Sequence, residues 1–294
     1  MKYLRLLHIA LLVSVSLAAS GVRAADCDNP PRLRFSLVPQ GDARKDAGIF
    51  RPLFEALEKE LGKPVEVIFP TSYGFVVEGL LAANIDLAFM GPASYAAAKN
   101  SDPDVQAFAS YSRKAGAFQE EGPFYRSLLI VRSDSRFRSR ESLRGARLAL
   151  VDPASTSGAV LPRHLFAPLV NTRFEQYFGR VVYTGGHEKS AVAVAKGQVD
   201  AAFVASNHLS DFIAEGKASK ENYLVLWQSQ PIPLDPFVYR GRLCAPIKEK
   251  IRKVFLGKNG EEYREVLEKL NAIRFAPIGD DSYKMIRETL RAAP

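Results

Sequence analysis

An internal repeat at a constant spacing of 114 residues constrains the fold of this chain more than any other feature. The segment SYGFVVEGLLAANIDLAFM, residues 72–90, aligns without a gap with GHEKSAVAVAKGQVDAAFV, residues 186–204. At the same spacing Leu37-Val38-Pro39 falls on Val151-Asp152-Pro153. A constant spacing across three strand–turn–helix units indicates two lobes built to the same design.

Short apolar runs alternate with amphipathic helical patterns along the chain. Strands are expected at residues 33–38, 65–69, 87–90, 105–111, 125–131 and 148–151, and helices at residues 48–61, 73–83 and 93–99. Strands that alternate with helices are typical of α/β folds with parallel sheets. The sequence therefore predicts an α/β protein.

The predicted helix starts mark where a ligand would bind. In open α/β sheets ligands bind beyond the carboxyl ends of the strands, where the next helices begin. Helix N-termini carry unpaired N–H groups and the positive end of the helix dipole, so two facing lobes would form an electropositive cleft. The helix starts lie at residues 41–48, 71–74, 91–94, 155–157, 185–187 and 206–207. Two of them carry Ser94 and Asn207, which we expect to contact the ligand.

The segment RLALVDPASTSG, residues 147–158, is the most informative of these starts. It predicts a buried strand, a turn at Asp152-Pro153 and then the hydroxyl residues Ser155, Thr156 and Ser157 ahead of an apolar helical run. Three hydroxyls beside a helix N-terminus make a site for a small oxyanion. The alternative is an ordinary helix cap, because Ser and Thr are preferred capping residues. The other motifs of the chain favour the oxyanion site.

The first 25 residues have the pattern of a secretory signal peptide. Lys2 and Arg5 precede an apolar run at residues 6–19 that is short for a membrane span, and Val22-Arg23-Ala24 is a small-x-small cleavage signal. We therefore expect the mature, exported and soluble protein to begin near residue 26. Removing the leader lowers the formal charge from +8 to +5, because it carries three basic residues and no acidic ones.

The distribution of charge bears on the class of partner, and the cysteine content bears on a possible disulfide. The basic residues are scattered rather than striped, so the sequence gives no sign of nucleic-acid binding. The two cysteines, Cys27 and Cys244, either form one disulfide or remain two thiols, and an exported protein permits the bond.

Enzymatic and metal-dependent functions find little support in the sequence. Ser157, His187 and Asp200 could be written as a catalytic triad, but no G-x-S-x-G motif surrounds the serine. The segment GHEKS is not an H-E-x-x-H motif, and no Cys/His cluster has metal-ligand spacing. Asp200 occupies the repeat position of Asp86, which suggests a structural role at the start of a strand. We expect a binding protein without a metal or cofactor.

Four motifs, in order, resemble one known family: SYGFVVEGLLAANIDLAFMGPASY, DPASTSG, GGHEKSAVAVAKGQVDAA and PIPLDPFVYR. They are similar to the phosphate, phosphite and phosphonate family of ABC-transporter substrate-binding proteins, and the likeness covers residues 33–255. The resemblance implies a type II periplasmic binding protein fold. In that fold two α/β lobes, each a mainly parallel sheet flanked by helices, are joined by a two-crossing hinge and close on the ligand.

The resemblance also implies roles for particular residues. The serine–threonine–serine anion loop of the family matches Ser155, Thr156 and Ser157, its cleft histidine matches His187, its first-lobe tyrosine matches Tyr73, and the aspartate before the second hinge matches Asp235. Members that bind aminophosphonates have a glutamate where this chain has Asn207 and an aromatic hydroxyl where it has Met90. These departures favour an inorganic oxyanion or an uncharged alkyl phosphonate as ligand.

The hinge crossings are expected at residues 124–127 and 233–239. Lobe one would then comprise residues 26–125 and 238–294, and lobe two residues 126–237. Helices expected at residues 247–255, 261–270 and 283–290 would pack on lobe one. A bond between Cys27 and Cys244 would lie within that lobe.

The family implies a monomeric protein of the periplasm that delivers a small oxyanion to an ABC permease in the inner membrane. The alternative is a sensor subunit that presents a bound phosphate-like or arsenate-like oxyanion to a membrane histidine kinase. The sequence does not identify the receptor.

Overall fold

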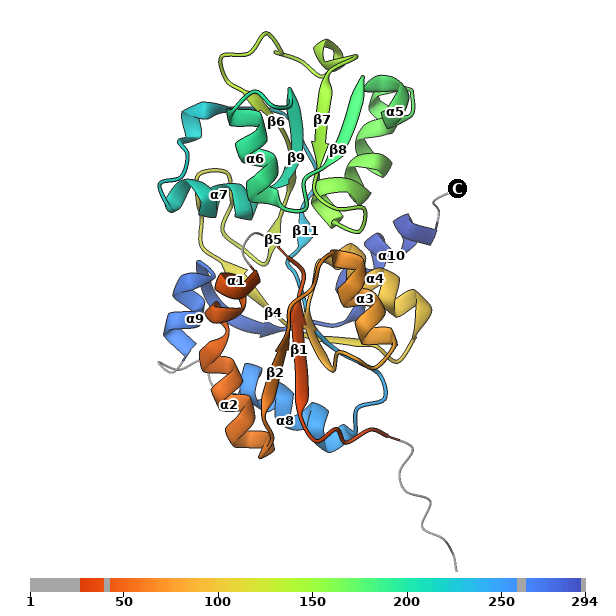
Figure 1. Cartoon of the computed structure of the whole chain (residues 1–294), viewed down its shortest axis with the longest axis vertical. Helices are drawn as coiled ribbons and strands as arrows, with labels where there is room; N and C mark the ends of the chain where they lie inside the picture. The colour runs from red at the N-terminus through yellow and green to blue at the C-terminus, as the bar shows by residue number, and fades with distance from the viewer. Residues whose placement is uncertain (1–26, 40–42, 258–262, 292–294) are drawn as a thin grey trace, which may run out of the picture.

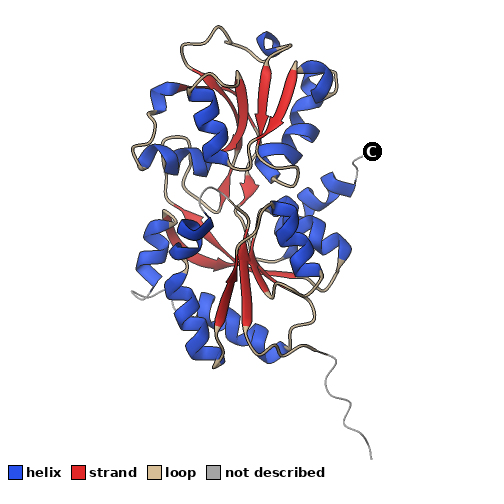
Figure 2. Cartoon of the chain, viewed as in Figure 1, coloured by secondary structure: helices blue, strands red, loops and turns tan. Residues whose placement is uncertain are grey.

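The fold is described from a computed structural model, which covers residues 27–39, 43–257 and 263–291. Two α/β lobes, one above the other in Figure 1, each contain a sheet with helices packed against it (Figures 1 and 2). This arrangement confirms the predicted two-lobe α/β fold. The predicted signal peptide lies outside the described residues. No helix within the described ranges is both long and apolar enough to span a membrane.

Lobe one contains a six-stranded sheet with the strand order β13-β4-β12-β3-β1-β2. Its strands are β1 (Leu33–Leu37), β2 (Val65–Ile68), β3 (Leu87–Phe89), β4 (Gln106–Arg113), β12 (Phe237–Tyr239) and β13 (Ala272–Pro277). Strand β1 pairs in parallel with β2 and β3, whereas β12 is antiparallel to both of its neighbours. Strand β12 runs in the opposite direction because there the chain returns from lobe two. The sheet is therefore more mixed than the mainly parallel sheet that we expected.

Lobe two repeats this arrangement with five strands in the order β10-β6-β9-β7-β8. Its strands are β6 (Ser127–Arg132), β7 (Arg147–Leu150), β8 (Arg180–Tyr183), β9 (Ala201–Ala205) and β10 (Tyr223–Gln228). Strand β7 pairs in parallel with β8 and β9, while β6 is antiparallel to β9 and β10. The parallel strands end at the edge that faces lobe one (Figure 1).

The helices cover the faces of both sheets (Figure 2). They are α1 (Ala43–Ile49), α2 (Arg51–Leu61), α3 (Tyr73–Leu81), α4 (Pro92–Ser101), α5 (Phe174–Tyr177), α6 (His187–Ala195), α7 (Ser206–Ala214), α8 (Ala245–Leu256), α9 (Arg264–Lys269) and α10 (Lys284–Arg291). The single helix expected at residues 48–61 is interrupted at Phe50. Pro52 accounts for the break, since its ring would clash with the carbonyl of residue 48 in a continuous helix. Helix α8 packs on β4, α9 on β13 and α10 on α4, all in lobe one.

Corresponding helices of the two lobes are separated by the predicted spacing of 114 residues. Helices α3 and α6 begin at Tyr73 and His187 and have the same length of nine residues. In the first strand the match shifts by one residue, because Arg34 pairs with Asp86 whereas Arg147 pairs with Asp200. The spacing there is 113, not the predicted 114. A shift of one residue in a strand exchanges its two faces, so the overlay of Leu37 on Val151 was wrong.

The chain crosses between the lobes through two short strands, β5 (Phe124–Tyr125) and β11 (Ile232–Pro233), which pair antiparallel. They lie between the two sheets in Figure 1. The second stretch expected to act as a hinge, residues 233–239, extends beyond this crossing, because β12 already belongs to the sheet of lobe one.

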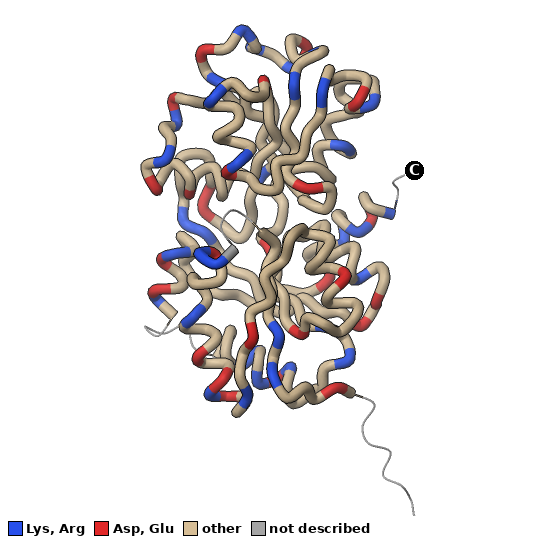
Figure 3. Tube along the Cα trace, in the orientation of Figure 1, with Lys and Arg blue, Asp and Glu red and all other residues tan. Residues whose placement is uncertain are grey.

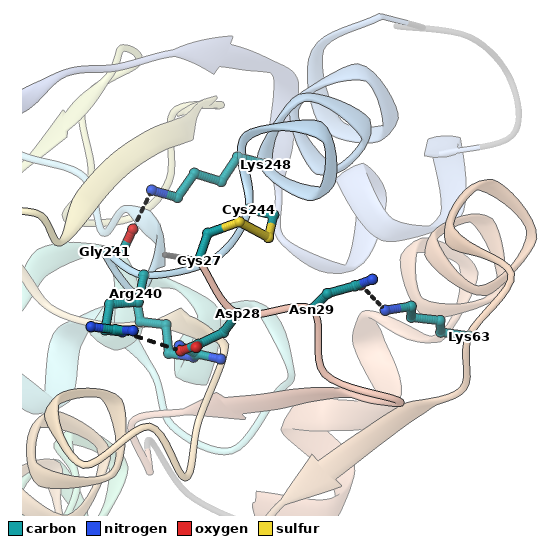
Figure 4. The surroundings of a disulfide bond; sticks show 9 residues. Cys27, Asp28, Asn29, Lys63, Arg240, Gly241, Cys244 and Lys248 are labelled. Carbon is teal, nitrogen blue, oxygen red and sulfur yellow. Dashed lines mark hydrogen bonds and ion pairs between the residues drawn. A yellow bond between two sulfur atoms is a disulfide. The ribbon is translucent and has the colours of Figure 1, made fainter. Parts of the chain in front are cut away.

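A disulfide joins Cys27 to Cys244, the residue that precedes α8 (Figure 4). The Asp28 amide donates to the carbonyl of Arg242, and the Cys244 amide donates to the carbonyl of Asp28. The buried guanidinium of Arg240 pairs with both Asp28 and Asp86. These bonds hold the first described residues against the start of α8.

Candidate ligand-binding site

A small cavity between the lobes brings the predicted helix starts together. Its lining residues come from both lobes: Tyr73, Gly91, Tyr125, Ser155, Thr156, Ser157, His187, Ala205, His208 and Asp235. The cavity measures about 10 Å³, which is roughly the space that holds one water-sized group. The walls of the cavity therefore stand close together.

The hydroxyl segment begins a turn of π-helix, Thr156–Val160, rather than the predicted α-helix. Ser155 precedes this turn, and its Oγ accepts the Gly158 N–H at 3.2 Å. The Ser155 hydroxyl is thus a helix cap and also lines the cavity, where it is hydrogen-bonded to the side chain of Tyr73. The two interpretations of the serine–threonine–serine segment are compatible.

Two further contacts fix the shape of this segment. The Ser127 Oγ donates to the carbonyl of Ser157 at 2.6 Å, from the neighbouring strand β6. A Cβ atom at position 158 would overlap the side chain of Val151, so only glycine fits where the turn folds back on β7. Both features constrain the backbone that carries Ser155, Thr156 and Ser157.

The segment also connects the two lobes. The Thr156 Oγ1 accepts the Ala93 N–H of α4 at 2.8 Å. The Ser94 Oγ donates to the carbonyl of Ala154 at 3.2 Å, and the Tyr73 N–H donates to Asp152 Oδ2 at 3.3 Å. The lobes are thus closed on each other. Ser94, which we expected to contact the ligand, contacts lobe two instead and does not line the cavity.

His187 is the first residue of α6 and is 5% exposed. Its Nδ1 accepts the Ala205 N–H at 3.0 Å, which places the ring proton on Nε2. Burial lowers the pKa of His187 to about 3, so the ring is neutral at physiological pH. His187 can therefore donate a hydrogen bond to an anion without carrying a charge.

Two buried tyrosines supply hydroxyls from the other side of the cavity. Burial, reinforced by the nearby carboxyl of Asp235, raises the pKa of Tyr73 and of Tyr125 well above the usual value. Both phenols therefore stay protonated and can donate. Tyr125 was not identified from the sequence, where it appeared only as part of a strand. Met90 is fully buried in the core of lobe one and does not line the cavity.

Asp235 follows the crossing strand β11 and is 8% exposed. Burial raises the pKa of its carboxyl to about 7, although the nearby guanidinium of Arg113 opposes the shift. Near neutral pH the Asp235 carboxyl is therefore protonated in part of the molecules and ionised in the rest. It can therefore either donate a proton to an oxyanion or accept one from a protonated oxyanion.

Helix α7 contributes a different residue from the one expected. Asn207 is 3% exposed, does not line the cavity, and its Oδ1 has no hydrogen-bond partner among the described residues. The next residue, His208, lines the cavity and stacks on His187 with a centroid distance of 4.9 Å and an interplanar angle of 10°. Helical geometry explains the difference, because neighbouring residues point in directions about 100° apart.

The cavity contains no lysine or arginine among its lining residues. Basic and acidic residues are interspersed over both lobes instead (Figure 3). Within the described part of the chain no group of three or more His, Cys, Asp and Glu could hold a metal ion. The polar groups among its lining residues are five hydroxyls, the imidazoles of His187 and His208, and the carboxyl of Asp235.

Comparison with known proteins identifies the family of this chain. A family model described as an ABC transporter, phosphonate, periplasmic substrate-binding protein matches residues 35–283. The phosphonates-binding periplasmic protein of Escherichia coli is 31% identical over 263 residues, covering 87% of this chain and 75% of the relative. The phosphate-import protein PhnD of Mycolicibacterium smegmatis is 26% identical over 255 residues, covering 84% and 78% respectively.

Solved structures agree with these relatives. The binding protein component of an ABC phosphonate transporter from Pseudomonas aeruginosa has a TM-score of 0.79 at 25% identity, covering 89% of this chain and 86% of the other. PhnD1 from Prochlorococcus marinus, solved with methylphosphonate, has the same fold, with a TM-score of 0.78 at 20% identity over 90% of this chain and 98% of the other. The chain belongs to the family of periplasmic substrate-binding proteins of phosphonate ABC transporters.

Proposed function

We propose that this protein captures a small phosphorus oxyanion between its two lobes and delivers it to an ABC permease in the inner membrane. The ligand is phosphate, phosphite or a simple alkyl phosphonate. The observation that carries the proposal is the donor set around the small cavity, which combines Ser155, Thr156 and Ser157 with His187 and the two tyrosines. The family is one of substrate-binding transport proteins rather than of enzymes, which supports a binding role.

Hydrogen bonds alone suffice to hold such a ligand. Each hydrogen bond to a charged group contributes about 1.5–3 kcal/mol, and a micromolar complex needs about 8 kcal/mol. Five or six bonds therefore cover this value after the costs of ordering and desolvation. Because the donors are neutral, no lysine has to be buried beside the ligand, which avoids a large desolvation penalty.

Asp235 supports the choice of a ligand that can carry a proton. A fully ionised carboxylate would repel a dianion, but a carboxyl with a pKa of about 7 can share a proton with a phosphate, phosphite or phosphonate. Sulfate is fully ionised at neutral pH, so it can pair only with the protonated form of Asp235, whereas a phosphorus oxyanion that carries a proton can also pair with the ionised form. The site should therefore bind phosphorus oxyanions in preference to sulfate.

Closure of the lobes is the signal that a permease would recognise. Tyr73 and the Ser155–Thr156–Ser157 segment come from different lobes, so a ligand held by both favours the closed form. A sensor subunit that presents the closed form to a membrane histidine kinase is the alternative function. Membership of a family of ABC-transporter proteins favours the permease.

Isothermal titration calorimetry of the mature protein tests this proposal. The titrants are phosphate, phosphite, methylphosphonate, aminoethylphosphonate, arsenate and sulfate. We expect tight one-to-one binding of at least one phosphorus oxyanion. Ser155→Ala/Thr156→Ala should weaken it about 100-fold or more, because two hydrogen bonds to a charged ligand are lost.

The matched control is Ser101→Ala/Thr172→Ala, which removes two hydroxyls outside the cavity and should leave the affinity unchanged. If none of the six oxyanions binds, the proposal is wrong. Equal loss of affinity in the control and in the Ser155/Thr156 variant would also contradict it.

A further inference from the structure

A second and much larger cavity lies beside the proposed oxyanion pocket. It measures about 530 Å³ and is bordered by both lobes. From lobe one, Ile49 and Phe50 line it near α1, and from lobe two Val192 and Phe212 line it on α6 and α7. This space is large enough for an alkyl or aryl group of several carbon atoms.

The two cavities share one lining residue, His208. Its ring lies parallel to that of His187, at a centroid distance of 4.9 Å. His187 is itself fixed, because its Nδ1 accepts the Ala205 N–H. The stacking on His187 therefore constrains the His208 side chain, which lines both the cavity of about 10 Å³ and the cavity of about 530 Å³.

We propose that His208 is a specificity-determining residue, whose ring closes the oxyanion pocket toward the large cavity and restricts the ligand to a compact substituent. The inference rests on the proposed function, because it assumes that the phosphorus group occupies the small cavity. A substituent of methyl size would stay on the near side of the ring. A larger substituent would have to pass through the position that the His208 ring occupies.

The walls of the large cavity indicate which substituents would be admitted if the partition were removed. Leu37, Phe50, Phe89 and Phe212 present apolar surface to it, and nine of its nineteen lining residues are charged. An uncharged alkyl or aryl group would gain free energy on leaving water where it contacts these apolar side chains. The wild-type protein should therefore discriminate against such phosphonates, and loss of the His208 ring should relax the discrimination.

The test compares methylphosphonate with phenylphosphonate by isothermal titration calorimetry. The quantity of interest is the ratio of the two dissociation constants in each variant. We expect the wild-type protein to favour methylphosphonate, and His208→Ala to shift the ratio toward phenylphosphonate by about 10-fold or more, a size typical of changes in pocket shape. His208→Phe restores a ring at the same position and should keep the wild-type preference.

His164→Ala is the matched control, because His164 lines neither cavity and its removal should leave the ratio unchanged. Equal affinity of the wild-type protein for both ligands would overturn the inference, as would an unchanged ratio in His208→Ala. If His208→Ala is folded by circular dichroism but binds neither ligand, His208 is needed for the compact site itself and the partition role is wrong. If the wild-type protein binds no phosphorus oxyanion, the proposed function fails first and the inference with it.

Discussion

The carboxyl group of Asp235 shares a buried pocket with the hydroxyls of Tyr73 and Tyr125, and the guanidinium of Arg113 lies near enough to oppose its shift. Its pKa of about 7 exceeds the ordinary value of 3.8 because burial disfavours the charged form. A group whose pKa is raised by folding stabilises the folded state at low pH. That contribution is complete below the unfolded pKa and is lost as the pH rises through the folded pKa.

Asp235→Asn should therefore change how stability depends on pH. In the ligand-free wild-type protein, the contribution of Asp235 declines between about pH 4 and pH 7, by on the order of 2–4 kcal/mol. Urea unfolding of both proteins at pH 5 and pH 8 measures the effect. We expect the variant to gain stability relative to wild type as the pH rises. Burial of His187 lowers its pKa, so this residue reduces stability as the pH falls below its unfolded pKa. Both proteins contain His187, so the difference in stability between them reports Asp235. An identical pH dependence in both proteins would contradict this account of the carboxyl group.

At the scale of elements, the π-helical turn Thr156–Val160 does the most to shape the site. The Val160 N–H donates to the carbonyl of Ser155 at 2.9 Å, five residues earlier, which is the spacing of a π-helix. The wide turn and the absence of a side chain at Gly158 allow the hydroxyl segment to fold against β7. Sequence patterns predicted a helix here, but they do not distinguish a π-helical from an α-helical start.

Gly158→Ala should therefore damage both folding and binding. Its methyl group would overlap Val151 and force the turn away from β7. We expect a loss of about 1–3 kcal/mol in unfolding free energy, the usual cost of overpacking, together with loss of oxyanion binding. Gly48→Ala is the control, since a methyl group there meets nothing within 4 Å and belongs to the exposed side of α1. Thermal unfolding and calorimetry of both variants measure the contrast. A fully stable, ligand-binding Gly158→Ala protein would show that the turn is not constrained in this way.

The repeat explains why much of the site was predictable from sequence. Helices α3 and α6 begin at equivalent positions, so Tyr73 and His187 could be placed at facing helix starts before the fold was known. The one-residue shift in the first strand escaped notice, because the length of a loop can absorb it without leaving a gap in the motifs that follow. The pairing of Cys27 with Cys244 was left open, and only the fold brings the two residues together.

Tyr125 and His208 could not be predicted, because their roles depend on how the lobes close. Tyr125 belongs to a two-residue crossing strand and carries no motif of its own. His208 lines the cavity because of the way α7 is oriented. It lies one residue after Asn207, the position that the sequence predicted. Contacts between lobes leave no periodic signal in a single sequence.

At the scale of the whole molecule, the contacts between lobes determine how readily the protein closes. The ion pair of Arg113 on β4 with Asp211 on α7 crosses the cleft without lining the small cavity. Arg113 is 2% exposed, and its Nε has no hydrogen-bond partner among the described residues. In the closed form Asp211 is the carboxylate that pairs directly with this guanidinium. In an open form water could solvate it instead.

Asp211→Asn should weaken closure and hence the binding of every ligand to the same extent. A buried cation without its counter-charge disfavours the closed form, so the equilibrium shifts toward the open form. We expect about 10-fold lower affinity for phosphate and for methylphosphonate alike. Glu215→Gln is the control, because its ion pair with Lys45 also crosses the cleft but is 45–61% exposed and should contribute little. An effect on one ligand but not on the other would indicate direct contact with the ligand rather than control of closure.

The most direct test of the central claim is a crystal structure of the mature protein with its tightest phosphorus oxyanion. The account predicts that the phosphorus atom lies between the lobes, with its oxygens within hydrogen-bond distance of the hydroxyls of Ser155, Thr156 and Ser157 on one side. A tyrosine hydroxyl should contact the ligand from the other side. A ligand seated in the large cavity, or bound by one lobe without contact to this hydroxyl segment, would contradict the account.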